Sequence, residues 1–241
     1  MAIKPILFST PMVQAIMEDR KTQTRRIKGL ESKNEFPDAW NRKGDPRKTT
    51  NRFWDHTKEK NPNPIAVEFG FHHNDFPEGD IAYMKAKVKP GDILWVRETW
   101  VPTRFDYMDM LKRGITHFIK YKADNDFDPK KELVGRPWKP SIHMPKAACR
   151  IFLEVTNVRV ERLQDISEVD AIAEGLERHS TAFKNYMVDL KDEFPIYNFH
   201  DPVNSFNSLW QSINGKDSWK SNPWVWVYDF KRTEKPANFL K

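Results

Sequence analysis

Residues 19–26 read Asp-Arg-Lys-Thr-Gln-Thr-Arg-Arg, and they join a short amphipathic segment, Pro11–Arg20, to a predicted strand. Successive side chains of a strand point to opposite faces. The strand therefore sorts these polar residues into two sets. If it begins at Gln23, the sets are Thr22, Thr24 and Arg26 on one face and Gln23 and Arg25 on the other.

Lys21 lies at the end of the amphipathic segment, from where its side chain can lean over Thr24. A lysine held near a hydroxyl can activate it as a nucleophile, as in Ser-Lys hydrolases. The same residues also fit a structural role with no catalysis. They would form a basic helix end, where cations interact favourably with the helix dipole and the polar groups are solvated. These eight residues alone leave both interpretations open.

The chain has 241 residues, enough for one large domain or two small ones with a real core. The apolar fraction is 39%, and there is no apolar run of about 18 residues that would predict a transmembrane helix. The apolar part of the N-terminus is too short for a signal peptide. A single cysteine, Cys149, excludes an intrachain disulfide framework, so we expect a cytoplasmic protein.

The net charge of +6 favours anionic partners only mildly, because forty basic residues face thirty-four acidic ones. Nine Trp and sixteen Phe are compatible with an aromatic core or with base stacking. The sequence contains neither a G-x-G-x-x-G motif nor a Gly-rich phosphate loop, which argues against Rossmann and P-loop folds.

Hydrophobic periodicity predicts a chain of mixed strands and helices, of the α+β class. Ser167 and Asp170 form an acidic variant of a capping box, and Gly175 closes the helix that follows Ser167. The predicted strands are Ile3–Phe8, Ile93–Trp100, Ala148–Arg162 and Trp224–Phe230, and the predicted helices include Ile166–Gly175 and Pro202–Ile213.

Three polar stretches interrupt this pattern, at about residues 29–80, 102–139 and 176–201. We interpret them as insertions in one domain that spans residues 1–241. The first insertion holds His56 and the pair His72 and His73, but no ligand spacing supports a closed metal site. We therefore predict neither a metal nor another cofactor.

Glu98 faces inward if Leu94 and Val96 do, since the three residues alternate along one predicted strand. A buried acid is either paired with an arginine or part of a functional site. Its possible partners are Arg25, Arg26 and Arg150.

Ser141 and His143 lie between two prolines, Pro140 and Pro145, which predict an extended segment that resists helix formation. A serine and a histidine two residues apart on such a segment share a side but rarely adopt catalytic geometry. We interpret the segment as the rigid wall of a pocket.

The order of several motifs resembles that of an ASCH domain protein, of the larger form often carried by phages and prophages. The resemblance covers about half of the residues and reaches both ends, and it depends on the order of the motifs more than on any one of them. It implies a small, mixed and mostly antiparallel PUA-like β-barrel with flanking helices. The motifs are Lys21–Arg26, Pro90–Val96, Pro140–Pro145, Leu163–Gly175 and Asn222–Phe230.

Members of this family are thought to bind RNA or modified nucleobases, and one small bacterial branch hydrolyses N4-acetylcytidine with a Lys, a Thr and a Glu. By motif, those three residues match Lys21, Thr24 and Glu174 of this chain. Asp19 is a departure, because many members have Gly two residues before the Lys, where the chain adopts a left-handed conformation.

From residues and resemblance together, we expect first a protein that binds a nucleobase, a nucleotide or RNA. Basic residues would contact phosphate, tryptophans would stack on the base, and an acid would accept from an exocyclic amine. Beside Lys21, Thr24 and Glu174, the expected binding residues are Arg25, Arg26, Glu98, Trp95, Trp138, Ser141, His143 and Arg150.

The alternative is an amidohydrolase of N4-acylated cytidine-type nucleosides. Thr24 would be the nucleophile, Lys21 the base with a lowered pKa, and Glu174 the acid that protonates the leaving amine. A third possibility is an accessory protein whose insertions bind another protein.

Overall fold

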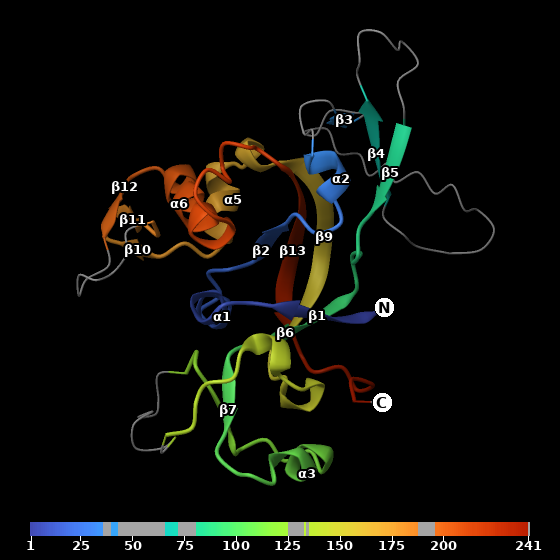
Figure 1. Cartoon of the computed structure of the whole chain (residues 1–241), viewed down its shortest axis with the longest axis vertical. Coiled ribbons are helices and arrows are strands. Elements are labelled where there is room, and N and C mark those ends of the chain that lie inside the picture. Colours follow the sequence, from blue (N-terminus) through green and yellow to red (C-terminus); the bar gives the residue numbers. More distant parts are fainter. Residues whose placement is uncertain are drawn as a thin grey trace, which may run out of the picture. The chain divides into compact units, whose positions relative to one another are not determined.

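The computed structural model describes residues 1–35, 40–42, 66–71, 81–124, 133, 135–187 and 196–240 (Figure 1). His56, His72 and His73 lie outside these residues. The chain divides into two compact units, each assembled from separate stretches of sequence. Unit 1 contains Met1–Asp19, Gly91–Glu154 and Phe230–Lys241, and unit 2 contains Arg20–Pro90 and Val155–Asp229. The single-domain organisation with three insertions stays a prediction.

Unit 1 is built around parallel and antiparallel neighbours of one central strand. Strand β1 (Ile3–Leu7) pairs in parallel with β6 (Ile93–Arg97), and β6 pairs antiparallel with the first residues of β9 (Phe152–Arg162). A separate antiparallel pair joins β7 (Trp100–Pro102) to β8 (Ile119–Tyr121). The helical elements of this unit are α1 (Thr10–Met17), α3 (Tyr107–Lys112), η2 (Ser141–His143) and η3 (Lys146–Ala148).

Aromatic side chains fill the core of unit 1. The Trp95 and Phe152 rings pack edge-on against Phe239, with centroids 5.9 and 4.7 Å away, respectively. Such edge-to-face pairs stabilise a core beyond the area that they bury. The other fully buried members of the core include Trp100, Leu111, Phe118, Met144 and Ala148.

Unit 2 holds the strand that residues 19–26 predict to begin at Gln23. Strand β2 (Gln23–Arg26) pairs antiparallel with β13 (Trp224–Thr233), so that Gln23 is opposite Asp229 and Arg26 is opposite Trp226. In the sheet order, β13 lies between β9 and β2. The remaining elements are α2 (Glu31–Asn34), β3 (Trp40–Arg42), β4 (Ala66–Phe71), β5 (Ile81–Lys85), η4 (Leu163–Asp165), α5 (Glu168–Ala173), β10 (Arg178–His179), β11 (Ala182–Lys184), β12 (Tyr197–Phe199) and α6 (Pro202–Asn214).

Helices α5 and α6 contact each other, and α6 also contacts β11 and β12 (Figure 1). Asp201 caps the start of helix α6, since its carboxylate accepts a hydrogen bond of 2.8 Å from the backbone N–H of Val203, and Gly215 caps its end. Its apolar stripe packs in one core with the inward side chains of β13. That core contains Leu163, Ile166, Ala171, Leu176, Phe183, Phe206, Trp210, Val225 and Val227.

The mixed helix and strand class predicted from the sequence is confirmed, and the described strands form several sheets. The strand order of the largest sheet in the described ranges is β1-β6-β9-β13-β2, and its closure into a barrel stays a prediction. None of the described helices is both long and apolar enough to cross a membrane.

Several predicted boundaries shift. The strand predicted from Ala148 begins at Phe152, because residues 146–148 form a short 3-10 turn after Pro145. The strand predicted for residues 93–100 ends at Arg97, and a new strand begins at Trp100.

The prediction of an extended Ser141–His143 segment was wrong. Pro140 is extended, as expected, but the next three residues form a 3-10 turn. The His143 N–H donates to the Pro140 carbonyl at 3.0 Å, and the Met144 N–H donates to the Ser141 carbonyl at 3.1 Å. Proline restricts its own φ and the residue before it, so the residues that follow Pro140 remain free to turn.

Asp19 follows the C-cap of α1, Glu18, and has φ +57°, in the left-handed region. A side chain in that region costs about 1–2 kcal/mol, and glycine pays none of it. We therefore predict that Asp19→Gly raises the melting temperature by about 2–4 °C, the shift that 1 kcal/mol produces in a domain of this size. The exposed contact of Asp19 with Arg232, at 3.6 Å, contributes little to this balance. Asp19→Ala, which loses the same contact but keeps a Cβ, should show no increase, and a lower melting temperature for the glycine variant would contradict this account.

Candidate functional site

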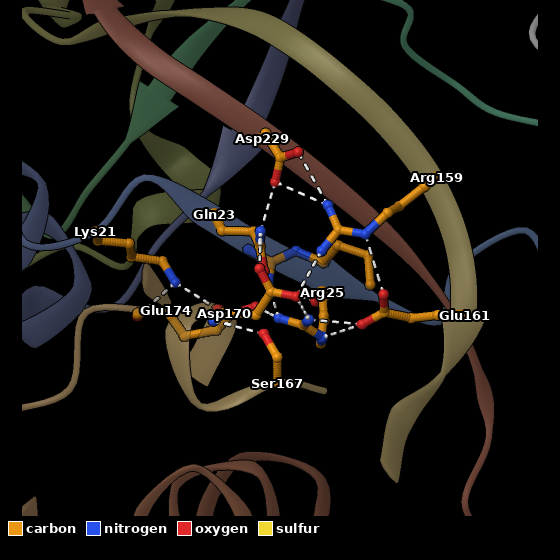
Figure 2. Close-up of polar contacts among 10 residues, drawn as sticks. Lys21, Gln23, Arg25, Arg159, Glu161, Ser167, Asp170, Glu174 and Asp229 are labelled. Atoms are coloured by element: carbon orange, nitrogen blue, oxygen red, sulfur yellow. Dashed lines mark hydrogen bonds and ion pairs between the residues drawn. The ribbon is translucent and has the colours of Figure 1, made fainter. Parts of the chain in front are cut away.

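Lys21 and Glu174 form a buried ion pair in unit 2 (Figure 2). The Lys21 Nζ lies 2.7 Å from Glu174 Oε2 and also donates to the Glu174 backbone carbonyl at 2.8 Å. The two residues form an isolated antiparallel β-bridge, and the Thr22 N–H donates to the Ala173 carbonyl at 2.9 Å. The Lys21 side chain is 0% exposed, so its charge depends on this partner.

The local sequence explains why Glu174 lies there. Ser167 caps α5 by accepting a hydrogen bond of 3.2 Å from the Asp170 N–H, which confirms the predicted cap, and Gly175 follows the helix with φ +88°. An acid at a helix C-terminus is unfavourable with respect to the helix dipole. Two cations offset this cost, since Lys21 bonds the Glu174 carbonyl and Arg20 Nη1 donates to the Gly175 carbonyl at 2.8 Å.

Arg25 holds the other oxygen of the same carboxylate. Its Nη1 donates to Glu174 Oε1 at 3.0 Å, while its Nε and Nη2 donate to Glu161 Oε1 at 3.0 and 2.6 Å. Asp170 Oδ2 lies 3.5 Å from Arg25 Nη2. The Arg25 side chain is 0% exposed, so its donors are committed to these carboxylates and to Gln23. Glu174 therefore joins Lys21 to Arg25 through one oxygen each.

An outer layer of charge surrounds Arg25, and the sequence analysis did not identify it. Arg159 donates to Glu161 at 3.0 Å, to Asp170 at 3.0 Å and to Asp229 at 2.9 Å. Gln23 donates to Asp229 at 2.6 Å and to Asp170 at 3.0 Å (Figure 2). Arg159 and Glu161 are two residues apart on β9 and alternate with buried valines, a pattern that could have indicated a charged face.

Burial lowers the pKa of Lys21, because the ammonium loses its hydration. Glu174 opposes this shift, and the positive charges of Arg26 and Arg25 add to it. Arg26 also interacts electrostatically with Glu174 and Tyr228. A lysine with a lowered pKa is closer to the neutral form that serves as a base.

Thr24 lies on the opposite face of β2 from Gln23 and Arg25, directly across from Tyr228 on β13. It is 1% exposed, and in the part of the chain that the structure describes its hydroxyl has no hydrogen-bond partner. Buried hydroxyls are normally hydrogen-bonded, so an unpaired one invites a functional explanation. Burial also raises the pKa of the Tyr228 hydroxyl to about 12, which keeps it protonated.

The predicted site residues fall into the two units. Unit 2 contains Lys21, Thr24, Arg25, Arg26 and Glu174, and it brings Lys21, Arg25 and Glu174 into direct contact. The Thr24 hydroxyl is not hydrogen-bonded to Lys21. Unit 1 contains the other six: Trp95, Glu98, Trp138, Ser141, His143 and Arg150.

Glu98 in unit 1 is paired, as one of the two interpretations of its sequence pattern required. Arg150 Nε and Nη2 each donate to its carboxylate at 2.9 Å, so among the three candidate arginines Arg150 is a partner. Arg150 Nη1 also lies 2.7 Å from Asp124. Burial raises the pKa of Glu98, and the hydrogen bonds from Arg150 oppose this shift.

The remaining predicted residues of unit 1 differ in exposure. Trp95 is buried against Phe239 in the core, which leaves little of its ring for stacking on a base. Trp138 and Ser141 are half-buried, and His143 is exposed on the short 3-10 turn.

Comparison with known proteins identifies no family for this chain. No family model matches the chain, no curated protein matches it, and no solved structure matches it. The resemblance to ASCH domain proteins therefore depends on the order of the sequence motifs.

We predict that Arg25→Met lowers the free energy of unfolding by about 3–5 kcal/mol, because it removes one of the two cations from each of two buried carboxylates, Glu161 and Glu174. Glu161 then keeps only Arg159, and Glu174 keeps only Lys21. Urea unfolding followed by circular dichroism measures this change. Arg104→Met removes the exposed pair with Asp106 and should leave the unfolding midpoint unchanged. Equal midpoints for the two variants would contradict the structural role of Arg25.

The lowered pKa of Lys21 also predicts a dependence of stability on pH. Unfolded lysine titrates near about 10.4, so between the folded pKa and this value the folded chain binds fewer protons than the unfolded chain. Its unfolding free energy therefore rises with pH across that window. Compared with Lys21→Met, the wild type should gain stability as pH rises from neutral toward about 10.4. A difference that is constant or shrinks would show that burial does not lower this pKa.

Proposed function

We propose that the chain is an ASCH-type amidohydrolase that cleaves N4-acylated cytidine-type nucleosides, with Thr24 as nucleophile. One observation carries the proposal: a buried, unpaired hydroxyl on Thr24 lies three residues from a buried lysine that is paired with Glu174. A nucleophile and a proton acceptor of this kind are the minimal parts of Lys-assisted acyl transfer. The fold expected for it is the PUA-like barrel, which the mixed, largely antiparallel pairing of the described strands supports.

The Lys21–Glu174 pair can supply both proton transfers of the first step. Transfer of one proton from the ammonium to the carboxylate gives a neutral amine and a carboxylic acid. Lys21 then accepts the Thr24 hydroxyl proton as Oγ1 attacks the acyl carbon, and Glu174 donates its proton to the leaving nitrogen. The acyl–nitrogen bond breaks, the acyl group is esterified to Thr24, and the pair returns to its ionic form.

Water completes the cycle with the roles reversed. Glu174 accepts a proton from the attacking water, and Lys21 donates one to Thr24 Oγ1 as the ester bond breaks. Arg25 stays bonded to Glu174 Oε1 throughout, which leaves Oε2 as the oxygen that exchanges protons with Lys21.

Ion pairing weakens the expectation of binding through phosphate. Arg25 and Arg150 were expected to contact phosphate, but both are held by carboxylates, from Glu161 and Glu174 in one case and from Glu98 and Asp124 in the other. A new phosphate contact would have to break a buried pair.

Binding of a nucleobase without turnover is the second candidate. It is favoured by the geometry of Lys21, whose Nζ is bonded to two oxygens of Glu174 and not to Thr24. The same face would then hold the base, and Thr24 would contribute a hydrogen bond instead of a nucleophile.

Release of cytidine from N4-acetylcytidine by the purified protein tests the proposal. We predict release by the wild type, and a loss of about 10²–10⁴-fold in kcat for Lys21→Ala and for Glu174→Ala, the usual contribution of a proton-transfer group. Thr24→Val, which keeps the shape of the side chain, should abolish turnover, and Thr24→Ser should retain part of it.

The two candidates differ in what Thr24→Val does to binding. If Thr24 is the nucleophile, the variant still binds N4-acetylcytidine but does not release cytidine. Undiminished release by Thr24→Val would contradict the hydrolase mechanism, and binding without any release by the wild type would favour the second candidate.

A further inference from the structure

Unit 1 carries a set of cationic side chains that lie over aromatic rings. Two of them share one ring, since the Nζ atoms of Lys146 and Lys235 lie 4.8 and 5.9 Å from the ring centroid of Phe239. A ring attracts a cation through its quadrupole but has no net charge, so it does not neutralise the cation. The other members of the set are Arg97 over Trp95, Arg136 over Phe105, and Lys139 over Trp100 and Tyr107.

None of these cations has a carboxylate partner among the residues that the structure describes. The two arginines of the set are held by backbone carbonyls. Arg97 Nη2 donates to the carbonyl of Ile142, and Arg136 Nη1 donates to that of Pro102 at 3.1 Å. Arg150 of the same unit differs, because it is paired with two carboxylates. The charge of the set is therefore left to an anion from outside the described chain.

One part of the set lies along helix α3. Arg136 Cζ lies 4.3 Å from the ring centroid of Phe105, which comes just before the helix. Lys139 Nζ lies 5.5 Å from the ring centroid of Tyr107, the first residue of the helix. Helix α3 contacts η3, and η3 begins with Lys146. These contacts connect the cations along α3 to the pair that shares the Phe239 ring.

The other part of the set lies over two packed rings of the core. The Trp95 ring is edge-on to the Phe239 ring, with the centroids 5.9 Å apart. Lys146 and Lys235 lie over Phe239, and Arg97 Cζ lies 5.5 Å from the Trp95 centroid. We call the whole connected set the cation row. Like charges held near one another repel, and a chain of phosphates would neutralise them.

Phe105 is 92% exposed, more than any other large apolar side chain in the described chain. One cation of the row already lies over its ring. The acids next to it are occupied by other residues. Asp106 pairs with Arg104 at 2.8 Å. Asp109 pairs with Lys112 at 3.2 Å. An exposed ring beside unneutralised cations is a platform on which a nucleobase can stack.

We propose that the cation row binds single-stranded nucleic acid, with phosphates along the row and one base stacked on Phe105. A single strand is favoured over a duplex, because the bases of a duplex are stacked on each other and do not offer a face to a side chain. The row lies in unit 1 and contains no residue of the Lys21 site. The inference is therefore independent of the proposed hydrolase.

Fluorescence anisotropy of a labelled uridine oligonucleotide of about 12 nucleotides tests the charge of the row. We expect the wild type to bind it with an affinity that falls as salt rises. The double variant Lys146→Gln/Lys235→Gln should bind more weakly. Its salt slope, the change of log association constant with log salt, should be smaller by about 1.4, because each phosphate contact on a single strand contributes about 0.7.

Lys216→Gln/Lys220→Gln is the matched control for net charge. It removes two exposed lysines of unit 2, which lie over no aromatic ring in the described chain, and should leave the salt slope unchanged. Failure of the wild type to bind the oligonucleotide at low salt would overturn the proposal. Equal salt slopes for the two double variants would also overturn it.

Phe105→Ala tests the stacked base separately from the charge. We expect the affinity to fall by about 5- to 150-fold, the effect of one lost base stack, with no change in the salt slope. Phe105→Trp should retain the affinity. Ile213→Ala, which removes an exposed apolar side chain of unit 2, should have no effect. Wild-type affinity in Phe105→Ala would overturn the proposal.

Polyglutamate distinguishes a nucleic acid from an acidic protein as the partner. It carries negative charge but no base, so we expect it to compete weakly and with no dependence on Phe105. Competition by polyglutamate as strong as that by unlabelled oligonucleotide would assign the row to an acidic protein and overturn the proposal.

Discussion

The carboxylate of Glu174 is shared between two cations that have no exposed side-chain surface, Lys21 and Arg25. A buried charge without a partner costs several kcal/mol, so the fold must bring Glu174 to both cations at once. It does so by ending α5 next to the start of β2, where Thr22 bonds Ala173. The helix cap at Ser167 and the left-handed Gly175 fix where α5 begins and ends, and thereby where the carboxylate lies.

The outer charges fix Arg25 in turn. Glu161 accepts from both Arg25 and Arg159, and Arg159 is bonded to Asp170 and Asp229 as well. Such a network gives each guanidinium one favourable orientation, because arginine donors are arranged in a rigid plane. In our account the network orients the Glu174 carboxylate toward Lys21. With Arg25 fixed on Glu174 Oε1, the other oxygen, Oε2, is left to Lys21.

Local signals predicted much of the framework. Ser167 before an acidic turn and Gly175 after it located α5, and Asn222-Pro223 followed by alternating aromatics and valines located β13. Prediction was weaker where a proline constrains one residue and frees the next. Pro140 and Pro145 are extended, yet Ser141–His143 between them turns.

The partners of charged side chains were the least predictable feature. Lys21, Arg25 and Glu174 were identified by motif, but spacing along the chain does not reveal that one carboxylate serves both cations. Arg159 and Glu161 were missed because they alternate with Val158 and Val160. The buried valines alone were enough to predict a strand, so the charged residues between them received no separate interpretation. For Glu98, the alternation along its strand predicted that the side chain points inward. Which of the three candidate arginines pairs with it could be seen only in the structure, where Arg150 is a partner.

The central claim is that the unpaired Thr24 hydroxyl receives an acyl group with the help of the Lys21–Glu174 pair. The most direct measurement is mass spectrometry of the protein quenched in acid shortly after mixing with N4-acetylcytidine, with peptide mapping of the modified residue. Our account predicts one acetyl group on Thr24 that disappears with time and is absent from Lys21→Ala. Cytidine release without any acetyl group on Thr24, or an acetyl group on another residue, would contradict it.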